Sequence, residues 1–188
     1  MKPRNWLFCM ILSCMLLLCG CGTKQTGPTI ARTEFPEKTQ RILQPIEGDT
    51  QFFDFTTDAS VTAAAVTVRY CQDGTWQEPE ALLELSDIQP GDYHLILRWM
   101  NDRVDAFIVE DGASYSNTYL LAPEWLEAFN ASVTASTVGF GSEKPIVAGE
   151  EIPLWCHYGS NTEEISAQSS DYSTSDCDTG LVIAITFS

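Results

Sequence analysis

The strongest constraint on the fold is a series of short segments in which apolar and polar residues alternate, each bounded by turn residues. In the segment 93–100, four apolar side chains share one face of an extended chain: Tyr93, Leu95, Leu97 and Trp99. A period of two is typical of a β-strand with one buried face. Similar segments recur: VTAAAVTVRYC, ALLELSDI, RVDAFIVE, SYSNTYLL, ASVTASTVGF, EIPLWCHY and GLVIAITF. The series predicts an all-β fold, an antiparallel β-sandwich of immunoglobulin-like or jelly-roll type.

Turn and helix signals separate these segments. Asp73-Gly74 marks a turn, and Asn101-Asp102 suggests a hairpin between the segments on either side of it. One segment, APEWLEAF, reads as a helix, because Pro123 suits a first helical position and Glu124 is favourable near the positive helix end. We therefore expect at most one short helix.

The first 20 residues have the composition of an export signal. Lys2 and Arg4 precede an apolar run from Trp6 to Leu18, as in the charged and apolar regions of a signal peptide. The run is about 13 residues long, well short of the roughly 20 that a membrane-spanning helix needs. We predict that residues 1–20 are removed after export.

The end of this run contains two closely spaced cysteines. Leu18-Cys19-Gly20-Cys21 resembles the lipobox of bacterial lipoproteins, in which small residues precede a cysteine that is acylated and becomes the first residue. The resemblance implies lipidation, such as palmitate, at Cys21 and anchoring on the extracytoplasmic face of the cell membrane. An ordinary secretory signal cleaved elsewhere and an uncleaved anchor are the alternatives.

Charge and composition divide the rest of the chain. Residues 21–49 are rich in Thr, Gln, Pro and charge without a sustained period, which predicts a flexible tether, and residues 50–188 form the predicted β-domain. The net charge is −16, and removal of Lys2 and Arg4 with the signal makes it −18. This charge opposes binding to nucleic acid. A solvated outward surface is the simplest interpretation, and binding of cations or a cationic partner is the alternative.

Three segments of the domain carry a resemblance: FDFTTDASVTAAAVTVRYCQDGTW, GEEIPLWCHY and LVIAITFS. They are similar to parts of a family of small lipoproteins of Firmicutes in which a β-domain follows the lipobox. The likeness spans roughly residues 50 to 188, and the region from Ser166 to Gly180 departs most from the family pattern. The resemblance implies a cellular location and a fold, and it implies no activity.

Cysteine and histidine provide little catalytic potential. Cys71, Cys156 and Cys177 remain in the domain, and small buried thiols are the simplest reading, with a single Cys156–Cys177 bridge as the alternative. No C-x-x-C pair supports a zinc or redox site. Although Cys156 precedes His157, adjacent residues of a strand point to opposite faces, so no thiol–imidazole pair is expected. No cofactor is implied by these residues.

The acidic segment DYSTSDCDTG contains the candidate metal ligands. Asp176 and Asp178 are spaced like the alternating oxygen ligands of a calcium loop. The EF-hand spacing is not met, because the third ligand position is Gly180 and no glutamate follows at the required distance. A solvated acidic turn is the alternative to calcium.

Aromatic residues provide the candidate ligand-binding positions. Trp76 follows a turn, and Trp155 shares a strand face with His157. Trp155 is displayed if the core face of its strand is the opposite one, which carries Ile152, Leu154, Cys156 and Tyr158. An exposed tryptophan can stack on a sugar ring or on a partner's side chain. Trp76, Trp155 and His157 are therefore candidates for ligand binding, and core packing is the alternative.

Three functional hypotheses follow. The first is a membrane-anchored, non-enzymatic module that binds a protein or an assembly of the cell envelope. The second is a module that binds surface polysaccharide and needs an exposed Trp76 or Trp155. The third is an envelope hydrolase using carboxylates such as Glu78, Glu80 or Asp105, although carboxylates are too common in this acidic chain to select a catalytic pair.

Overall fold

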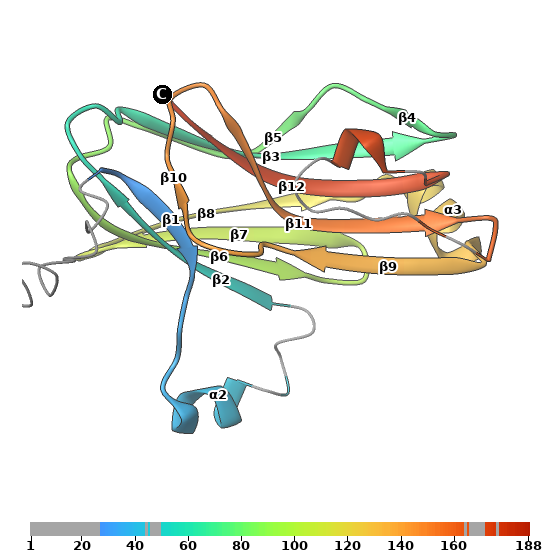
Figure 1. Cartoon of the computed structure of the whole chain (residues 1–188), viewed down its shortest axis with the longest axis horizontal. Coiled ribbons are helices and arrows are strands. Elements are labelled where there is room, and N and C mark those ends of the chain that lie inside the picture. The colour runs from blue at the N-terminus through green and yellow to red at the C-terminus, as the bar shows by residue number, and fades with distance from the viewer. Residues whose placement is uncertain (1–26, 44, 46–49, 164, 166–171, 176) are drawn as a thin grey trace, which may run out of the picture.

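The alternating segments form two antiparallel sheets packed face to face (Figure 1). The structure is a computed structural model and describes residues 27–43, 45, 50–163, 165, 172–175 and 177–188. The predicted signal peptide and Cys21 lie outside the described residues. The all-β sandwich that the alternation predicts is confirmed.

Sheet A, the first sheet, contains six described strands in the order β10-β1-β2-β6-β7-β8. The strand bounds are β10 Lys144–Pro145, β1 Thr29–Arg32, β2 Thr50–Thr57, β6 Gly91–Trp99, β7 Arg103–Glu110 and β8 Ala113–Leu120. Asp111 and Gly112 alone join β7 to β8, since Glu110 pairs with Ala113. Gly112 has a φ of 84°, a left-handed conformation that glycine adopts without the steric cost that a side chain would add.

Sheet B, the second sheet, has the order β4-β3-β12-β11-β9, and β5 also pairs with β3. The strand bounds are β3 Ala63–Gln72, β4 Thr75–Trp76, β5 Glu80–Ser86, β9 Thr134–Gly139, β11 Glu151–Ser160 and β12 Thr179–Phe187. The predicted turn at Asp73-Gly74 connects β3 with β4. β12 comes last in the chain and lies in the middle of the sheet, between β3 and β11.

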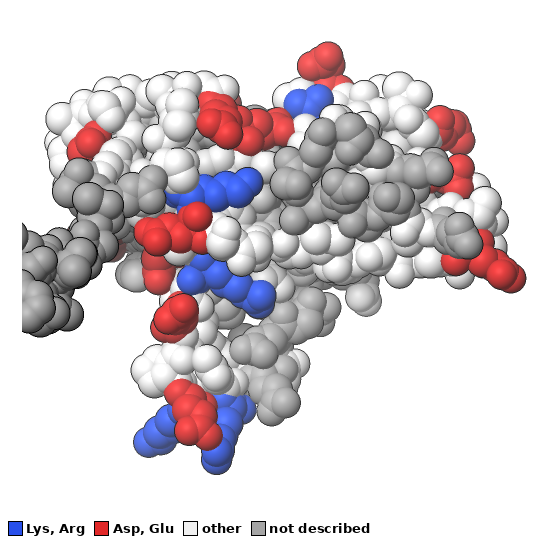
Figure 2. Space-filling model, viewed as in Figure 1, with Lys and Arg blue, Asp and Glu red and all other residues white. Residues whose placement is uncertain are grey.

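The folded domain begins before residue 50, which corrects the tether predicted over residues 21–49. β1 lies within that range, pairs with both β2 and β10, and buries Ile30 completely. The helix α2 (Glu37–Leu43) follows and stands away from the sheets (Figure 1). It carries charged side chains (Figure 2), among them Glu37 and Arg41, which form an ion pair. Because β1 is only four residues long, alternation cannot reveal it.

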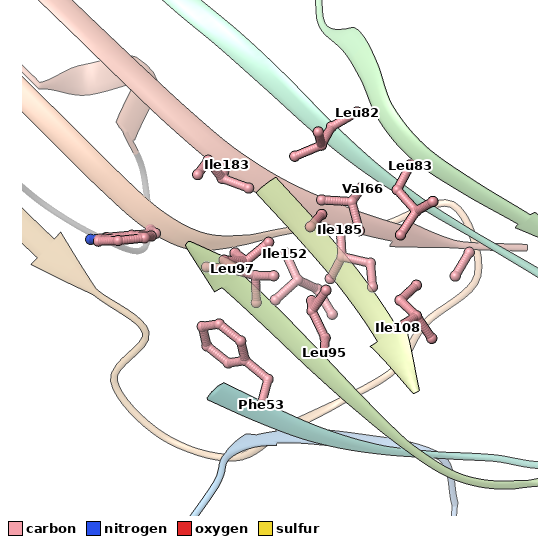
Figure 3. Close-up of a cluster of buried hydrophobic side chains, with 14 of the residues drawn as sticks. Phe53, Val66, Leu82, Leu83, Leu95, Leu97, Ile108, Ile152, Ile183 and Ile185 are labelled. Atoms are coloured by element: carbon pink, nitrogen blue, oxygen red, sulfur yellow. The ribbon is translucent and has the colours of Figure 1, made fainter. Parts of the chain in front are cut away.

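The core lies between the inner faces of the two sheets (Figure 3). Sheet A contributes Phe53, Leu95, Leu97 and Ile108, and sheet B contributes Val66, Ile152, Ile183 and Ile185. Burying an aliphatic or aromatic side chain of this size contributes roughly 1.5 to 3 kcal/mol. The predicted inner face of β6 is buried at Tyr93, Leu95 and Leu97, and Trp99 at its end is half-buried.

A β-bulge in β11 changes which side chains face the core. The register shifts between Pro153 and Trp155, with Leu154 as the extra residue. The inner-face residues of β12 that pair across it are Ile185, opposite Ile152, and Ile183, opposite Trp155. A bulge adds one residue to one strand, so the alternation of faces reverses beyond it.

Two α-helices lie among the described residues, one more than expected. The predicted helix is confirmed as α3 (Pro123–Ala131), whose Trp125 is buried and donates a 2.9 Å hydrogen bond from Nε1 to the carbonyl oxygen of Gly180. A 3₁₀ turn, η1, spans Tyr172–Thr174. In the part of the chain that the structure describes, no helix has the length and apolar character to cross a membrane.

Candidate binding surface

The outer face of sheet B is covered by the chain itself. Five outward side chains of its central strands are no more than 2% exposed: Cys71, Cys156, Tyr158, Val182 and Ala184. With Cys177 they form a second buried cluster, against which Trp76, Ile165 and Tyr172 pack. β11 and β12 are therefore buried on both faces and offer no surface to a partner.

The outer face of sheet A carries a row of half-exposed apolar side chains. Phe52 of β2 pairs with Ile96 of β6, which pairs with Phe107 of β7. All three are half-buried, and paired residues of antiparallel strands lie side by side on one face. Phe35 packs edge-on against Phe52 with ring centroids 5.1 Å apart. We call Phe52, Ile96 and Phe107 the apolar row.

A buried carboxylate organises the polar residues on one side of the apolar row. Asp105 is 4% exposed and accepts hydrogen bonds from Arg98 Nε and Nη2 at 3.1 and 2.6 Å, and from Thr118 Oγ1 at 2.8 Å. Arg103 adds an ion pair at 3.5 Å. Burial by itself raises the pKa of Asp105, but the hydrogen bonds from Arg98 and Thr118 and the two guanidinium charges outweigh it and lower the pKa.

A smaller polar group lies on the other side of the apolar row. Asp54 Oδ1 accepts a 2.8 Å hydrogen bond from Thr33 Oγ1 and lies 2.7 Å from His94 Nδ1. The His94 and Asp54 side chains are 60% and 44% exposed. These groups are accessible to solvent and hold one another across β2 and β6.

Two hollows border this surface. One, of about 470 Å³, is lined on the Asp105 side by residues that include Arg98, Phe107 and Thr118. The other, of about 760 Å³, is lined by residues that include Asp54 and His94. The outer face of sheet A therefore combines an apolar centre with a polar rim, the usual composition of a protein–protein contact.

The bulge places Trp155 inside the sandwich, so its predicted display is wrong. Trp155 is 1% exposed and packs against Trp99 at a centroid distance of 6.2 Å. Trp76 is half-buried, and its ring meets Tyr172 edge-on at 5.0 Å and Tyr158 at 6.4 Å. The polysaccharide hypothesis needs an exposed Trp76 or Trp155. Only Trp76 keeps part of its ring exposed.

His157 faces the same side as Trp155 and is buried with it. It is 8% exposed, and its ring lies 4.2 Å from that of Trp99. Thr137 Oγ1 lies 3.1 Å from His157 Nδ1, while Nε2 has no partner among the described residues. Burial lowers the pKa of His157 to about 4, because the charged imidazolium loses its hydration there. His157 is neutral at pH 7 and packs as an aromatic ring.

The candidate calcium ligands are only partly described. Asp178 Oδ2 accepts hydrogen bonds from the Asn161 backbone N at 2.6 Å and from Ser160 Oγ at 3.2 Å. Asp176 lies outside the described residues. No cluster of three or more His, Cys, Asp or Glu residues suited to a metal is found in the described ranges. Asp178 thus has a structural role, because it ties the start of β12 to the end of β11.

The remaining catalytic candidates are separated. Cys156 belongs to the outer cluster of sheet B, whereas His157 faces the core, and burial raises the pKa of Cys156 to about 11. Tyr119 donates a 2.6 Å hydrogen bond to Glu80 on β5, while Asp105 is held by Arg98 on sheet A. Glu78 is exposed between β4 and β5. Cys156 and His157 therefore form no thiol–imidazole pair, and Glu80 and Asp105 belong to separate hydrogen-bond networks.

Sequence reasoning did not find the Arg98–Asp105 pair, although a signal for it exists. Arg98 precedes the predicted hairpin turn at Asn101-Asp102 by three residues, and Asp105 follows it by three. A hairpin centred on that turn places the two residues opposite one another, as the register shows. Opposite charges at paired positions were the missed signal.

Comparisons of the chain with protein-family models, with curated proteins and with solved structures gave no match.

Proposed function

We propose that this chain is a lipid-anchored, extracytoplasmic binding module that contacts a protein of the cell envelope through the outer face of sheet A. The observation that carries the proposal is the contrast between the two outer faces: the outer face of sheet B is buried under the chain's own residues, and the apolar row of sheet A is not. The anchor rests on the signal-like segment and on Cys21.

The chemistry of the surface favours a protein partner. The apolar row provides aromatic and aliphatic contact area on paired, rigid strands, which reduces the entropy lost on binding. Arg98 lies at its edge with its side chain 46% exposed, its charge partly compensated by Asp105. Arginine and aromatic residues are enriched in the central parts of protein interfaces.

Site-specific photo-crosslinking in the producing cell tests the contact. A photoreactive phenylalanine at Ile96 should form a defined product with one envelope protein. The matched control is the same group at Val133, which is 65% exposed and lies between α3 and β9, away from this surface. Phe52→Asp in the crosslinking chain should abolish the Ile96 product. Equal products from both positions, or a product that survives Phe52→Asp, would contradict the proposal.

The anchor is tested separately. Mass spectrometry of detergent-extracted protein should find a mature chain that starts at an acylated Cys21, and Cys21→Ser should release the chain from the membrane fraction. A mature chain with another first residue or without lipid would refute this part of the proposal and leave the binding surface to be judged by crosslinking.

A further inference from the structure

Two of the three cysteines meet on the covered face of sheet B. Cys71 on β3 is 1% exposed, and Cys177, just before β12, is 5% exposed. The structure holds both as thiols. Cys71 Sγ lies 3.7 Å from the carbonyl oxygen of Cys177, and the two side chains hydrogen-bond, which lowers the pKa of Cys71. These residues are 106 positions apart in sequence and adjacent in space.

Gly180 makes this approach possible. It pairs with Cys71 across β3 and β12. A Cβ atom on Gly180 would lie 3.2 Å from Cys71 Cβ, 3.3 Å from Cys177 Sγ and 2.8 Å from the ring of Trp76. The Cys177 side chain and the indole ring therefore occupy the space that a side chain at position 180 would need. Both cysteine side chains converge on this one point of the sheet.

Backbone contacts fix the position of Cys177 from both sides. The next residue, Asp178, donates a hydrogen bond from its backbone N to the carbonyl oxygen of Gly159 at 3.0 Å. Its own carbonyl oxygen accepts a 3.2 Å hydrogen bond from the backbone N of Gly74, in the turn after β3. Cys177 is thus held between β11 and the β3–β4 turn, and its nearness to Cys71 follows from the pairing of three strands.

Cys156 is not placed to compete for either partner. It pairs with Val182, two residues beyond Gly180 and on the far side of β12 from β3. Two inter-strand steps and two residues of strand separate Cys71 from Cys156, which is roughly 12 Å between Cα atoms. A disulfide requires a Cα separation of about 4.4 to 6.8 Å. A Cys71–Cys156 bridge is therefore excluded. The Cys156–Cys177 bridge considered from the sequence is less favoured than a Cys71–Cys177 bridge, because Cys177 Sγ lies over Gly180, which pairs directly with Cys71, whereas Cys156 pairs with Val182 two residues further along β12.

We propose that Cys71 and Cys177 form a disulfide bond that fastens the residues just before β12 to β3. A disulfide-containing oxidant, RSSR, supplies the second sulfur. The Cys71 thiolate attacks one sulfur of RSSR and releases RS⁻. The Cys177 thiolate then attacks Cys71 Sγ in this mixed disulfide and releases the second RS⁻. The protein loses two electrons and two protons, and RSSR becomes two RSH molecules. Cys156 stays a thiol.

The bond is expected to stabilise the fold, because it closes a long loop across the middle of the sheet. In the chain-entropy account, stabilisation by a disulfide increases with the length of the loop it closes. For a loop of this length we expect the oxidised protein to unfold about 10 °C above the reduced protein.

Peptide mapping tests the pairing. The full chain is unfolded with reductant and refolded with oxidised glutathione, because Cys71 and Cys177 are 1% and 5% exposed once folded, and it is then alkylated in denaturant without reductant and digested. A linked peptide pair containing Cys71 and Cys177 is expected, with Cys156 alkylated. Recovery of both Cys71 and Cys177 in alkylated form, or a linked pair that contains Cys156, would overturn the proposal. Because oxidant is added to purified protein, this result does not depend on export or on Cys21.

Two variants keep the test specific. Cys156→Ala should retain the linked pair and the oxidant-dependent rise of about 10 °C. Cys177→Ser should lose both and leave Cys71 alkylated. A Cys177→Ser variant that still gains stability on oxidation would show that another cysteine pair is responsible.

Discussion

The two outer faces of the sandwich are built from strands of different kinds. β11 and β12 are apolar along nearly their whole length and buried on both sides. In sheet A, β6 and β7 alternate between buried and half-exposed or polar positions, and their outer face stays open. A continuous apolar strand needs cover on both faces, whereas an alternating strand needs cover on one. Ile165, Tyr172 and Cys177, from the connection between β11 and β12, thus belong to the packing of sheet B, whereas Phe52, Ile96 and Phe107 on the outer face of sheet A stay partly exposed.

The largest difference between the two outer faces is expected when a side chain on each is truncated to alanine. Tyr158, on the outer face of sheet B, is fully buried, and Tyr158→Ala should lower the free energy of unfolding by about 3 to 5 kcal/mol. Ile96→Ala, on the open face, should cost about 1 kcal/mol or less, since part of its side chain already meets water. Denaturant unfolding measures both, and equal losses would mean that the two faces are covered alike.

His157, on the inner face of sheet B, makes the free energy of unfolding depend on pH. Its pKa is about 4 when folded and about 6.5 when unfolded. Above pH 6.5 both states are neutral and the histidine has no effect. Between pH 6.5 and 4 only the unfolded state binds the proton, so stability falls, by on the order of 3 kcal/mol in total.

Unfolding titrations against pH should show that His157→Gln removes this loss. Thr137→Val deletes the bond to Nδ1 without removing the titrating group, so it should lower stability and keep the wild-type slope. A His157→Gln slope equal to that of the wild type between pH 6.5 and 4 would contradict the assignment.

On sheet A, the strongest polar contact is that of Asp105. Asp105→Asn leaves Arg98 and Arg103 without their charged partner and should cost about 2 kcal/mol near neutral pH. Because the folded pKa of Asp105 is lowered, its stabilisation is complete above the unfolded value near 3.8 and disappears as pH falls through the folded value.

Chemical unfolding at pH 7 and at pH 2.5 should therefore show a smaller difference between the variant and the wild type at the lower pH. Asp102→Asn is the control, because this side chain is 66% exposed and should cost less than about 0.5 kcal/mol. A loss from Asp102→Asn as large as that from Asp105→Asn would argue against a special role for the buried carboxylate.

The smallest loss of stability is expected for Phe107 on the outer face of sheet A. Phe107→Ser removes the last ring of the apolar row, which is half-exposed and lies 5.7 Å from the Arg98 guanidinium. It should cost about 1 kcal/mol or less and still abolish the crosslink formed from position 96. A variant that folds normally and crosslinks fully would remove the apolar row from the binding surface.

Much of this architecture could be read from alternation and turn residues. The hairpin at Asn101-Asp102, the turn at Asp73-Gly74, the helix beginning at Pro123 and the inner face of β6 all lie where local patterns predicted them. Local patterns succeed there because the turn chemistry and the hydrophobic period agree. β1 escaped prediction because four residues show too little of a period, and only its pairing with β2 and β10 makes it a strand.

The candidate sites were harder to predict, because they depend on register. One extra residue, Leu154, reverses the faces of Trp155 and His157 and moves both from the expected display into the core. The apolar row is likewise invisible along the chain, because its residues come from three strands and become neighbours only through pairing. Phe52 lies 44 positions before Ile96 in the sequence and directly beside it in the sheet.

The central position of β12 sets an order of events during biosynthesis. β3 precedes its partner β12 by more than a hundred residues, since Cys71 pairs with Gly180, so the edge of β3 that faces β12 stays unpaired until β12 has been made. Long-range pairing of this kind slows folding and exposes apolar strands to aggregation in the meantime. Because synthesis proceeds from the amino end, β3 is made long before its partner, and sheet B is completed only once β12 has been made and has paired with β3.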